Sequence, residues 1–220
     1  MNQLKIKVCG LKYPKNQELI TSLPIDYAGF IFYKKSQRYT LRISEKLPEH
    51  IQKVGVFVNA PQEDIISSIR KYKLDIIQLH GNENIPEIQV LREKLIEKNL
   101  HFTQLWKAIN IKNESDLELA KLYDNYVDVL LLDAKGALPG GNGIRFDWNL
   151  LNNQDFTSPL MLSGGIKIDH TEEIEALAHN NKIWGVDINS GFEVNPGLKD
   201  WARVKRFVED VKAISFSEVD

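Results

Sequence analysis

The chain has 220 residues, of which 43% are hydrophobic and 26% charged, close to the average for a soluble globular protein. Its formal net charge of -2, from 28 basic and 30 acidic residues, argues against a nucleic-acid partner, which favours a basic surface. No apolar run approaches the roughly 20 residues that cross a bilayer, and MNQLKIKV lacks a leader pattern, so we expect no membrane association. The single cysteine, Cys9, cannot form an internal disulfide and fits a reducing, cytoplasmic setting.

Short runs rich in Val, Ile and Leu recur along the chain, with helix-like segments between them. Their ends lie 22 to 30 residues apart. This spacing favours repeated strand–helix units over an antiparallel meander, in which a strand follows about every 8–12 residues. We predict eight strands, at residues 4–9, 27–32, 53–58, 75–80, 103–109, 128–133, 159–164 and 183–188.

Helical patterns occupy most of the segments between these strands. Residues 61–73 begin with Pro and two acidic residues and end in basic ones, as the helix dipole favours. Apolar residues at spacings of three and four predict helices over 85–100 and 115–126. Residues 215–220 are expected to be a frayed tail. A last helix is predicted over 196–214, with one buried stripe formed by Trp201, Val204, Val208 and Val211.

Eight such units predict a single (β/α)8 barrel over residues 1–214. The alternative is a doubly wound sheet, which favours a GxGxxG turn after its first strand. The sequence there is CGLKYPK, and the richest glycine cluster, PGGNGIRF (139–146), lies past the sixth strand with Phe146 in place of the third glycine. The barrel is therefore the favoured fold.

In a barrel, functional residues are expected where the strands end, because active sites lie in the loops that follow them. Three groups stand out there: Cys9 ends the first strand, Asp133 the sixth, and Asp187 lies near the end of the eighth. Alternation along the first strand puts Lys5 and Lys7 on one face with Cys9. We expect that face to point inward, since the outer face meets apolar helices. An ammonium group near the thiol would lower the pKa of Cys9.

Each of these residues also has a purely structural interpretation. A lone buried cysteine is most often inert, and an aspartate after a strand often forms a cap or turn. His80, in QLHGNE, is expected to be a structural histidine rather than a catalyst. The basic segment 34–38 fits a solvated loop, and the four tryptophans fit packing.

Two loops have the composition of phosphate-binding loops. LSGGIK (162–167) leads from the seventh strand, and DINSGFE (187–193) follows the eighth. Small residues let backbone N–H groups approach an oxyanion, and many barrels bind phosphate after strands seven and eight. SGG also forms ordinary turns, so the position of both loops together indicates phosphate binding more strongly than either motif.

Seven segments of the chain form an ordered set: KVCGLK, GFIFYKKSQRY, VGVFVN, IQLHGNE, LLDAKGALPGGNGIRFDW, LSGGI and GVDINSGFEVNPGLKD. In this order and at this spacing, they resemble the phosphoribosylanthranilate isomerases of tryptophan biosynthesis. The resemblance implies a (β/α)8 barrel that needs no cofactor and takes a phosphosugar substrate, N-(5-phosphoribosyl)anthranilate. It implies an Amadori rearrangement of this aminoaldose to an aminoketose, 1-(2-carboxyphenylamino)-1-deoxyribulose 5-phosphate.

The resemblance also implies roles for particular residues. Cys9 would be the general base that removes the C2 proton, and Asp133 the general acid that protonates the ring oxygen. Arg38 would hold the anthranilate carboxylate, and Asp187 would lie near the sugar. The phosphate-binding positions would be Gly164, Gly165, Ser190 and Gly191. Three residues depart from those common in the family, which leaves the loop details open: Lys12, Ala134 and Asn189.

Two other functions compete with this interpretation. A silent barrel that binds a sugar phosphate would be expected to lose Cys9 or Asp133, and both are present. A related isomerase of a histidine-pathway intermediate would have an aspartate on the first strand of each half, where this chain has Cys9. The five histidines lack ligand spacing, so no metal is expected. A monomer or a homodimer is expected.

Overall fold

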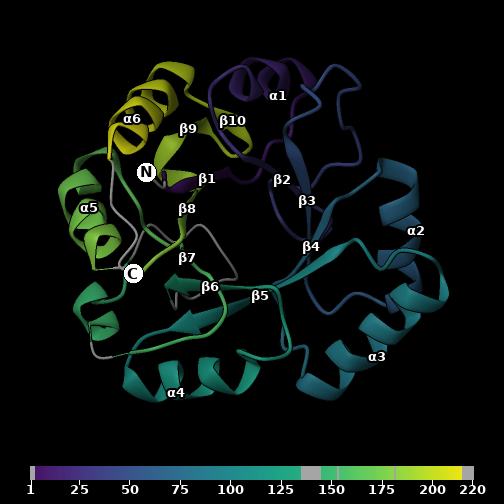
Figure 1. Cartoon of the computed structure of the whole chain (residues 1–220). Helices are drawn as coiled ribbons and strands as arrows, with labels where there is room; N and C mark the ends of the chain where they lie inside the picture. Colours follow the sequence, from purple (N-terminus) through teal and green to yellow (C-terminus); the bar gives the residue numbers. More distant parts are fainter. Residues whose placement is uncertain (1–2, 135–144, 153, 181, 215–220) are drawn as a thin grey trace.

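The computed structural model describes residues 3–134, 145–152, 154–180 and 182–214. Across these ranges, eight parallel strands close into a barrel in the order β1 to β8. Figure 1 shows the strands in the middle of the molecule and the helices around them. The predicted (β/α)8 barrel is confirmed. The expected tail, 215–220, and most of the glycine cluster lie outside the described residues.

Every predicted strand is present, and the ends differ from the prediction by at most two residues. The barrel closes where β1 pairs with β8, in parallel register from Lys5 opposite Gly185 to Val8 opposite Ile188. All strands therefore point their carboxyl ends to the same side. The strands are β1 Lys5–Val8, β2 Tyr27–Ile31, β3 Gln52–Phe57, β4 Ile76–Leu79, β5 Gln104–Ile111, β6 Val129–Ala134, β7 Leu160–Leu162 and β8 Gly185–Ile188.

Side chains cap the first turn of three of the described α-helices. Asn84 caps α3 and Asn113 caps α4, each in a capping box that is closed by an acidic residue three positions on. Between β2 and β3, residues 32–51 form a loop without an α-helix, and the described residues between β6 and β7 form a 3-10 turn, η1 Trp148–Leu151. The helices are α1 Pro14–Thr21, α2 Gln62–Tyr72, α3 Ile85–Glu97, α4 Glu114–Tyr123, α5 Thr171–His179 and α6 Trp201–Ala213.

The last helix differs from its prediction. It begins at Trp201 rather than at residue 196, because residues 198–199 form a short strand, β10, that pairs with β9 Glu193–Asn195. Asp200 then caps α6 by accepting from the Arg203 N–H at 3.1 Å. Trp201, predicted to be buried, is 36% exposed, since it lies on the first turn beyond the barrel wall. Four residues form the buried stripe: Val204, Phe207, Val208 and Val211.

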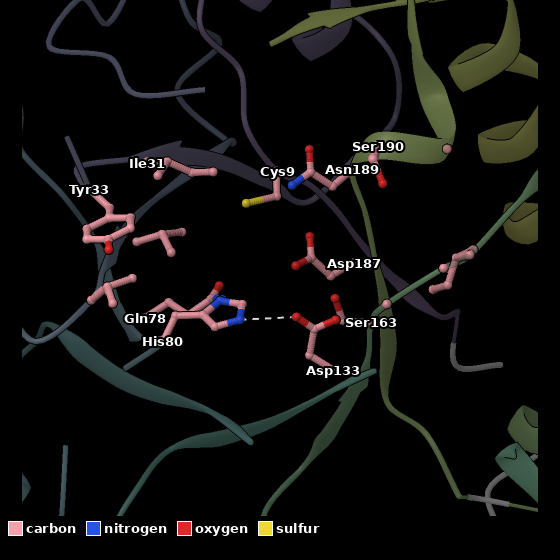
Figure 2. A pocket seen from close by; sticks show the side chains of 16 residues that line it. Cys9, Ile31, Tyr33, Gln78, His80, Asp133, Ser163, Asp187, Asn189 and Ser190 are labelled. Atoms are coloured by element: carbon pink, nitrogen blue, oxygen red, sulfur yellow. Dashed lines mark hydrogen bonds and ion pairs between the residues drawn. The ribbon is translucent and has the colours of Figure 1, made fainter. Parts of the chain in front are cut away.

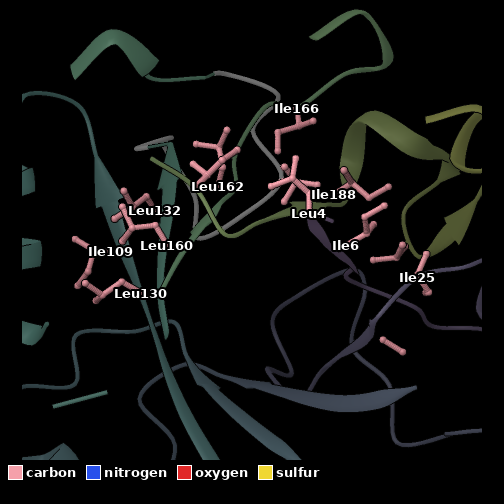
Figure 3. Packing of buried hydrophobic residues seen from close by; sticks show 14 of the residues in the cluster. Leu4, Ile6, Ile25, Ile109, Leu130, Leu132, Leu160, Leu162, Ile166 and Ile188 are labelled. Atoms are coloured by element: carbon pink, nitrogen blue, oxygen red, sulfur yellow. The ribbon is translucent and has the colours of Figure 1, made fainter. Parts of the chain in front are cut away.

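The buried side chains form two layers, one inside the barrel and one between the strands and the helices. The outer layer holds most of the aliphatic residues, as Figure 3 shows around Leu4, Ile6 and Ile188. Inside, aromatic side chains fill the lower barrel: the Tyr27 and Trp106 rings lie 4.9 Å apart, and Trp106 is fully buried. These packed rings, the aromatic floor of the barrel, confine any ligand to the end of the barrel where the strands have their carboxyl ends. Among the described residues, none of the helices has the length and apolar character required to cross a membrane.

Candidate active site

A pocket opens at the end of the barrel where the strands have their carboxyl ends. It encloses about 620 Å³ of space continuous with solvent. Figure 2 shows Cys9, Asp187 and Asp133 facing this space, with His80 opposite Asp133. Every predicted site residue except Arg38 lines the pocket: Cys9, Asp133, Gly164, Gly165, Asp187, Ser190 and Gly191.

Cys9 is held at the end of β1 by backbone contacts. Its N–H donates to the Ile188 carbonyl at 2.9 Å, which extends the pairing of β1 with β8. Gly29 on β2 leaves room for the thiol, because a Cβ there would lie 2.9 Å from Cys9 Sγ. Burial raises the pKa of Cys9, and the nearby Lys7 ammonium only partly opposes that rise. The expectation of a lowered pKa is therefore wrong: at this depth desolvation outweighs the lowering by the Lys7 and Lys199 ammonium groups.

Lys7 lies directly below the pocket and faces inward, as predicted from strand alternation. It is 0% exposed, and its Nζ lies 2.8 Å from Asp187 Oδ2. Burial lowers the pKa of Lys7, but Asp187 and Cys9 raise it by more, so the ammonium stays charged. Asp187 Oδ1 is buried and accepts no hydrogen bond from a described residue. Lys5 lies at the other end of the strand, where its half-exposed side chain pairs with Asp26.

Asp133 is placed at the rim of the pocket by β6, whose residues are all buried. Its Oδ1 accepts from the Ala134 N–H at 3.0 Å, and its Oδ2 lies 3.1 Å from His80 Nε2. Gly164 packs against it with a φ of +81°, a conformation that favours glycine. A Cβ at position 164 would lie 2.5 Å from Asp133 Oδ1, so the glycine is required both by its backbone and by the carboxylate.

His80 is the site residue that sequence reasoning set aside. It follows β4, lines the pocket, and contacts Asp133 directly. Its second ring nitrogen, Nδ1, lies 3.0 Å from Gln78 Nε2. The rule that selected Asp133, a polar residue at the end of a barrel strand, selects His80 equally. Histidines are more often structural than catalytic, so the sequence alone favours a structural role for His80.

The loops after β7 and β8 meet at one side of the pocket. Gly164 and Gly165 both have positive φ, +81° and +68°, and Gly191 packs so closely that a Cβ would lie 2.5 Å from the Ile166 carbonyl oxygen. Within the described part of the chain, the N–H groups of Gly164, Gly165, Ser190 and Gly191 have no hydrogen-bond acceptor. N–H donors without an acceptor, on two loops that line one pocket, are suited to an anion.

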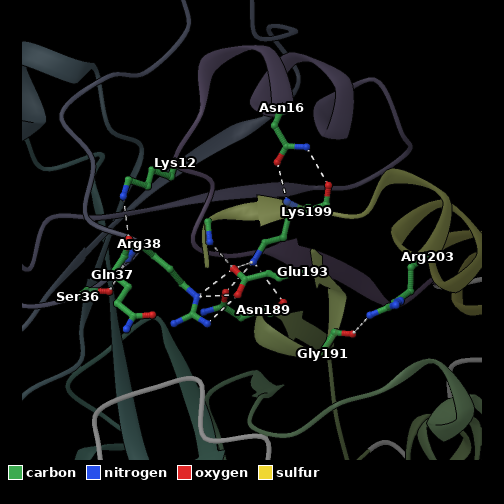
Figure 4. Close-up of polar contacts among 11 residues, drawn as sticks. Lys12, Asn16, Ser36, Gln37, Arg38, Asn189, Gly191, Glu193, Lys199 and Arg203 are labelled. Carbon is green, nitrogen blue, oxygen red and sulfur yellow. Dashed lines mark hydrogen bonds and ion pairs between the residues drawn. The ribbon is translucent and has the colours of Figure 1, made fainter. Parts of the chain in front are cut away.

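Arg38 does not line the pocket. Its Nε lies 2.9 Å from Glu193 Oε1 and its Nη2 2.7 Å from Glu193 Oε2, a two-pronged ion pair (Figure 4). Glu193 also accepts from Lys199 Nζ at 2.8 Å, and Lys199 donates to Asn189 Oδ1 at 2.7 Å. Asn189 lines the pocket, so this network forms its outer wall. Sequence reasoning missed Glu193 and Lys199, because neither stands at the end of a predicted strand.

Fold and pocket together define a (β/α)8-barrel enzyme whose site holds a thiol and a carboxyl group, with the glycine-containing loops after β7 and β8 beside them. Among the described residues, no three His, Cys, Asp or Glu side chains are arranged to hold a metal ion. A sequence model of the family described as N-(5'phosphoribosyl)anthranilate (PRA) isomerase matches residues 6–210. The chain belongs to this family, and it is an isomerase of tryptophan biosynthesis.

Individual relatives agree with the family model. N-(5'-phosphoribosyl)anthranilate isomerase of Parabacteroides distasonis is 38% identical over 94% of this chain and 92% of that protein. The crystal structure of mutually generated monomers of the dimeric enzyme from Thermotoga maritima has a TM-score of 0.78 and 33% identity, covering 95% of this chain and 98% of its own. A phosphoribosyl anthranilate isomerase structure in complex with reduced 1-(o-carboxyphenylamino)-1-deoxyribulose 5-phosphate has a TM-score of 0.78 and 32% identity, with the same coverage.

Proposed function

We propose that this isomerase converts N-(5'-phosphoribosyl)anthranilate to 1-(o-carboxyphenylamino)-1-deoxyribulose 5-phosphate, with Asp133 as general acid and Cys9 as general base. The observation that carries the proposal is that Cys9 and Asp133 line one pocket together with the loops after β7 and β8, whose N–H groups have no acceptor among the described residues. A phosphate on those loops would bring the sugar ring between the acid and the base. No metal or cofactor is part of the proposal.

The first step is opening of the sugar ring. Asp133 gives its proton to the ring oxygen, the bond from C1 to that oxygen breaks, and the lone pair of the anthranilate nitrogen forms the C=N bond of a Schiff base. An ordinary carboxyl group is only about 0.1% protonated at pH 7, so this acid needs help to keep its proton. Asp133 is buried, 4% exposed, and its Oδ2 lies 3.1 Å from His80 Nε2, so the acid has a protein partner beside the pocket.

The second step is removal of the proton from C2. The Cys9 thiolate takes this proton, the electron pair moves into a C1–C2 double bond, and the enolamine then tautomerises to the ketone as C1 gains a proton. The raised pKa of Cys9 makes the thiolate scarce but strongly basic. The Lys7 ammonium, held by Asp187, limits that rise and keeps some thiolate available.

The two ends of the substrate would be bound by different groups. The phosphate would accept from the N–H groups of Gly164, Gly165, Ser190 and Gly191. The anthranilate carboxylate would bind Arg38, whose Nε and Nη2 face Glu193 while Nη1 makes no bond to a described residue. Asp187, with its free Oδ1, would accept from a sugar hydroxyl.

Two further features are part of the proposal. A homodimer or a monomer both fit a barrel of this size, and the Thermotoga maritima relative is described as dimeric. A cytoplasmic location fits a thiol base, which must stay reduced to act.

The test follows the fluorescence of the substrate, made in situ from anthranilate, as it is consumed. Cys9→Ser and Asp133→Asn should each lower kcat/KM by about 10²- to 10⁴-fold, the usual contribution of a general acid or base. Asp155→Asn is the matched control, because its carboxylate is solvent-exposed and lies away from the pocket. Circular dichroism should show the same fold for all three variants.

The proposal has two separable parts. A wild-type protein that binds ribose 5-phosphate but turns over no substrate would overturn the activity and leave a silent sugar-phosphate barrel. Full activity in Cys9→Ser would overturn the base and leave the reaction standing.

A further inference from the structure

Gln78, His80 and Asp133 form a chain of polar contacts that runs from the barrel interior to the pocket. Gln78, on β4, is fully buried, and its Nε2 lies 3.0 Å from His80 Nδ1. The other ring nitrogen, Nε2, lies 3.1 Å from Asp133 Oδ2 (Figure 2). Both nitrogens of His80 are therefore engaged within the protein. Any effect of His80 on a substrate must act through Asp133.

The amide of Gln78 can serve the imidazole in either protonation state. With Nε2 toward the ring, it donates to an unprotonated Nδ1, which leaves the single ring proton on Nε2, directed at the Asp133 carboxylate. With the amide turned over, Oε1 accepts a proton from Nδ1, which suits an imidazolium. Oε1 is buried and accepts no hydrogen bond from a described residue, so it is available for that exchange.

Building on the proposed function, we propose that Gln78 and His80 are positioning residues that keep a transferable proton on the acid, so that Asp133 and His80 act as one acid holding one proton. A free imidazole titrates near pH 6.5 and a free carboxyl near 3.9. The 3.1 Å contact lets Nε2 and Oδ2 share one proton, which gives Asp133 a neighbouring group that can carry the proton it transfers. Asp133 remains the catalytic residue that touches the substrate.

The proton balance of the step is simple. In the charged pair, His80 carries protons on both nitrogens and Asp133 is ionised. As the sugar ring opens, Asp133 gives a proton to the ring oxygen and receives the Nε2 proton, which leaves neutral His80 with a proton on Nδ1. The pair regains one proton from the C2 hydroxyl, which must lose it when the ketone forms.

The loop that carries His80 is held in place from outside the barrel. Lys107 Nζ donates to the Gly81 carbonyl at 2.7 Å and to Glu83 Oε2 at 2.8 Å, while Glu83 accepts from the Gly81 N–H at 2.9 Å. His80 therefore has a fixed backbone on one side and a fixed carboxylate on the other. The titratable and charged groups around the pair are Cys9 and Lys7 from β1, Tyr33 after β2, Asp187 from β8, and the mutually paired Glu83 and Lys107.

The experiment measures kcat/KM against pH for wild type, His80→Gln and Gln78→Glu. Because the base has the higher pKa, the midpoint of the acidic limb reports the acid and that of the alkaline limb reports Cys9. Glutamine at position 80 can still donate to Asp133 but cannot carry the proton. The acidic midpoint should therefore fall by two or more pH units, with a plateau about 10²- to 10³-fold lower. Gln78→Glu should move the same midpoint upward, because a carboxylate favours the imidazolium.

His101→Gln is the matched control, since His101 is exposed on the turn before β5. A nitrogen-15 spectrum of wild type below the acidic midpoint should show His80 protonated on both ring nitrogens. A His80→Gln enzyme that keeps the wild-type acidic midpoint would overturn the inference, and so would a ring that carries no proton on Nδ1 at that pH. If wild type itself has no activity, the proposed function fails instead, and the nitrogen-15 measurement still decides the arrangement of the pair.

Discussion

Two buried lysines, Lys7 on β1 and Lys107 on β5, make the same contact on opposite faces of the barrel wall. Lys7 is 0% and Lys107 2% exposed, and each has its Nζ 2.8 Å from a carboxylate oxygen, of Asp187 and Glu83 respectively. Lys7 shares the inner face of its strand with Cys9. Lys107 lies between Leu105 and Ile109, which belong to the outer layer.

The difference between these two pairs lies in what surrounds them. Next to Lys7, the thiol and Asp187 face the pocket, so its charge lies beside the proposed base. Lys107 instead contacts the Gly81 carbonyl and Glu83, so its charge holds the loop after β4. A buried ion pair is weak evidence for function by itself. Strand alternation, which decides the face, is what separates a site residue from a scaffold residue.

The largest effect is expected for Lys7→Met. This change leaves the buried Asp187 carboxylate without its ion-pair partner, which should lower the free energy of unfolding by about 3–5 kcal/mol. It also removes the charge that opposes the raised pKa of Cys9, so the alkaline midpoint of kcat/KM should move up by about one pH unit, with a plateau about tenfold lower. Urea unfolding and the pH–rate profile measure the two effects.

The double variant Lys7→Met/Asp187→Asn separates stability from chemistry. The double variant has no unpaired buried carboxylate, so it should regain much of the lost stability, because neutral groups of similar shape replace the ion pair. Its alkaline midpoint should stay above that of wild type, since burial of Cys9 is unchanged. An unshifted midpoint in the single variant would show that Lys7 has no influence on the base.

Lys107→Met should mainly affect stability. Glu83 would lose its partner but keep two backbone donors, Asn59 N–H and Gly81 N–H, and its side chain is 11% exposed, so we expect a loss of about 2–3 kcal/mol. Burial raises the pKa of Glu83, but Lys107 and its hydrogen bonds lower it by more. The wild-type pair therefore stabilises the fold above the ordinary carboxyl range and loses that contribution as pH falls through the lowered pKa.

Chemical denaturation at pH 7 and again near pH 3 measures this prediction. The difference between wild type and Lys107→Met should be large at pH 7 and small in acid. Equal differences at both values would mean that the charge of Glu83 plays no part. Once folded, the variant should keep an unchanged alkaline midpoint, in contrast with Lys7→Met.

Much of the fold and of the site could be predicted from the sequence, and there are physical reasons why the other features could not. The regular spacing of apolar runs along the chain predicts the strands, because the spacing alone shows which segments are buried. The inner face of β1 followed from the two lysines beside Cys9. The raised pKa of Cys9 did not, because the depth of burial depends on side chains from other strands. The Arg38–Glu193 pair joins residues 155 positions apart, and no local pattern links them.

The substitution Arg38→Lys tests whether a lysine can replace the two-pronged guanidinium group of Arg38. A lysine can pair with Glu193 or with a substrate carboxylate, but it cannot present two parallel N–H groups to one while holding the other. We expect KM to rise about tenfold, equivalent to about 1.4 kcal/mol, with kcat little changed. Arg42→Lys, an exposed arginine in the same loop, is the control and should leave both constants unchanged. A fall in kcat alone would place Arg38 in the chemical step instead of in binding.

The smallest effect is expected for Lys5→Met. Lys5 lies on the same strand as Lys7 and on the same face. Its Nζ is 3.1 Å from Asp26 Oδ1, but the side chain is 42% exposed and Asp26 keeps Lys212 at 2.8 Å. An exposed pair of this kind contributes about 0.5 kcal/mol, so unfolding and both limbs of the pH–rate profile should be almost unchanged. If Lys5→Met moved the alkaline midpoint as Lys7→Met does, charge anywhere on the inner face of β1 would control the thiol. An effect confined to Lys7 would instead show that the ammonium must contact a pocket residue to influence the thiol, as Lys7 contacts Asp187 at 2.8 Å.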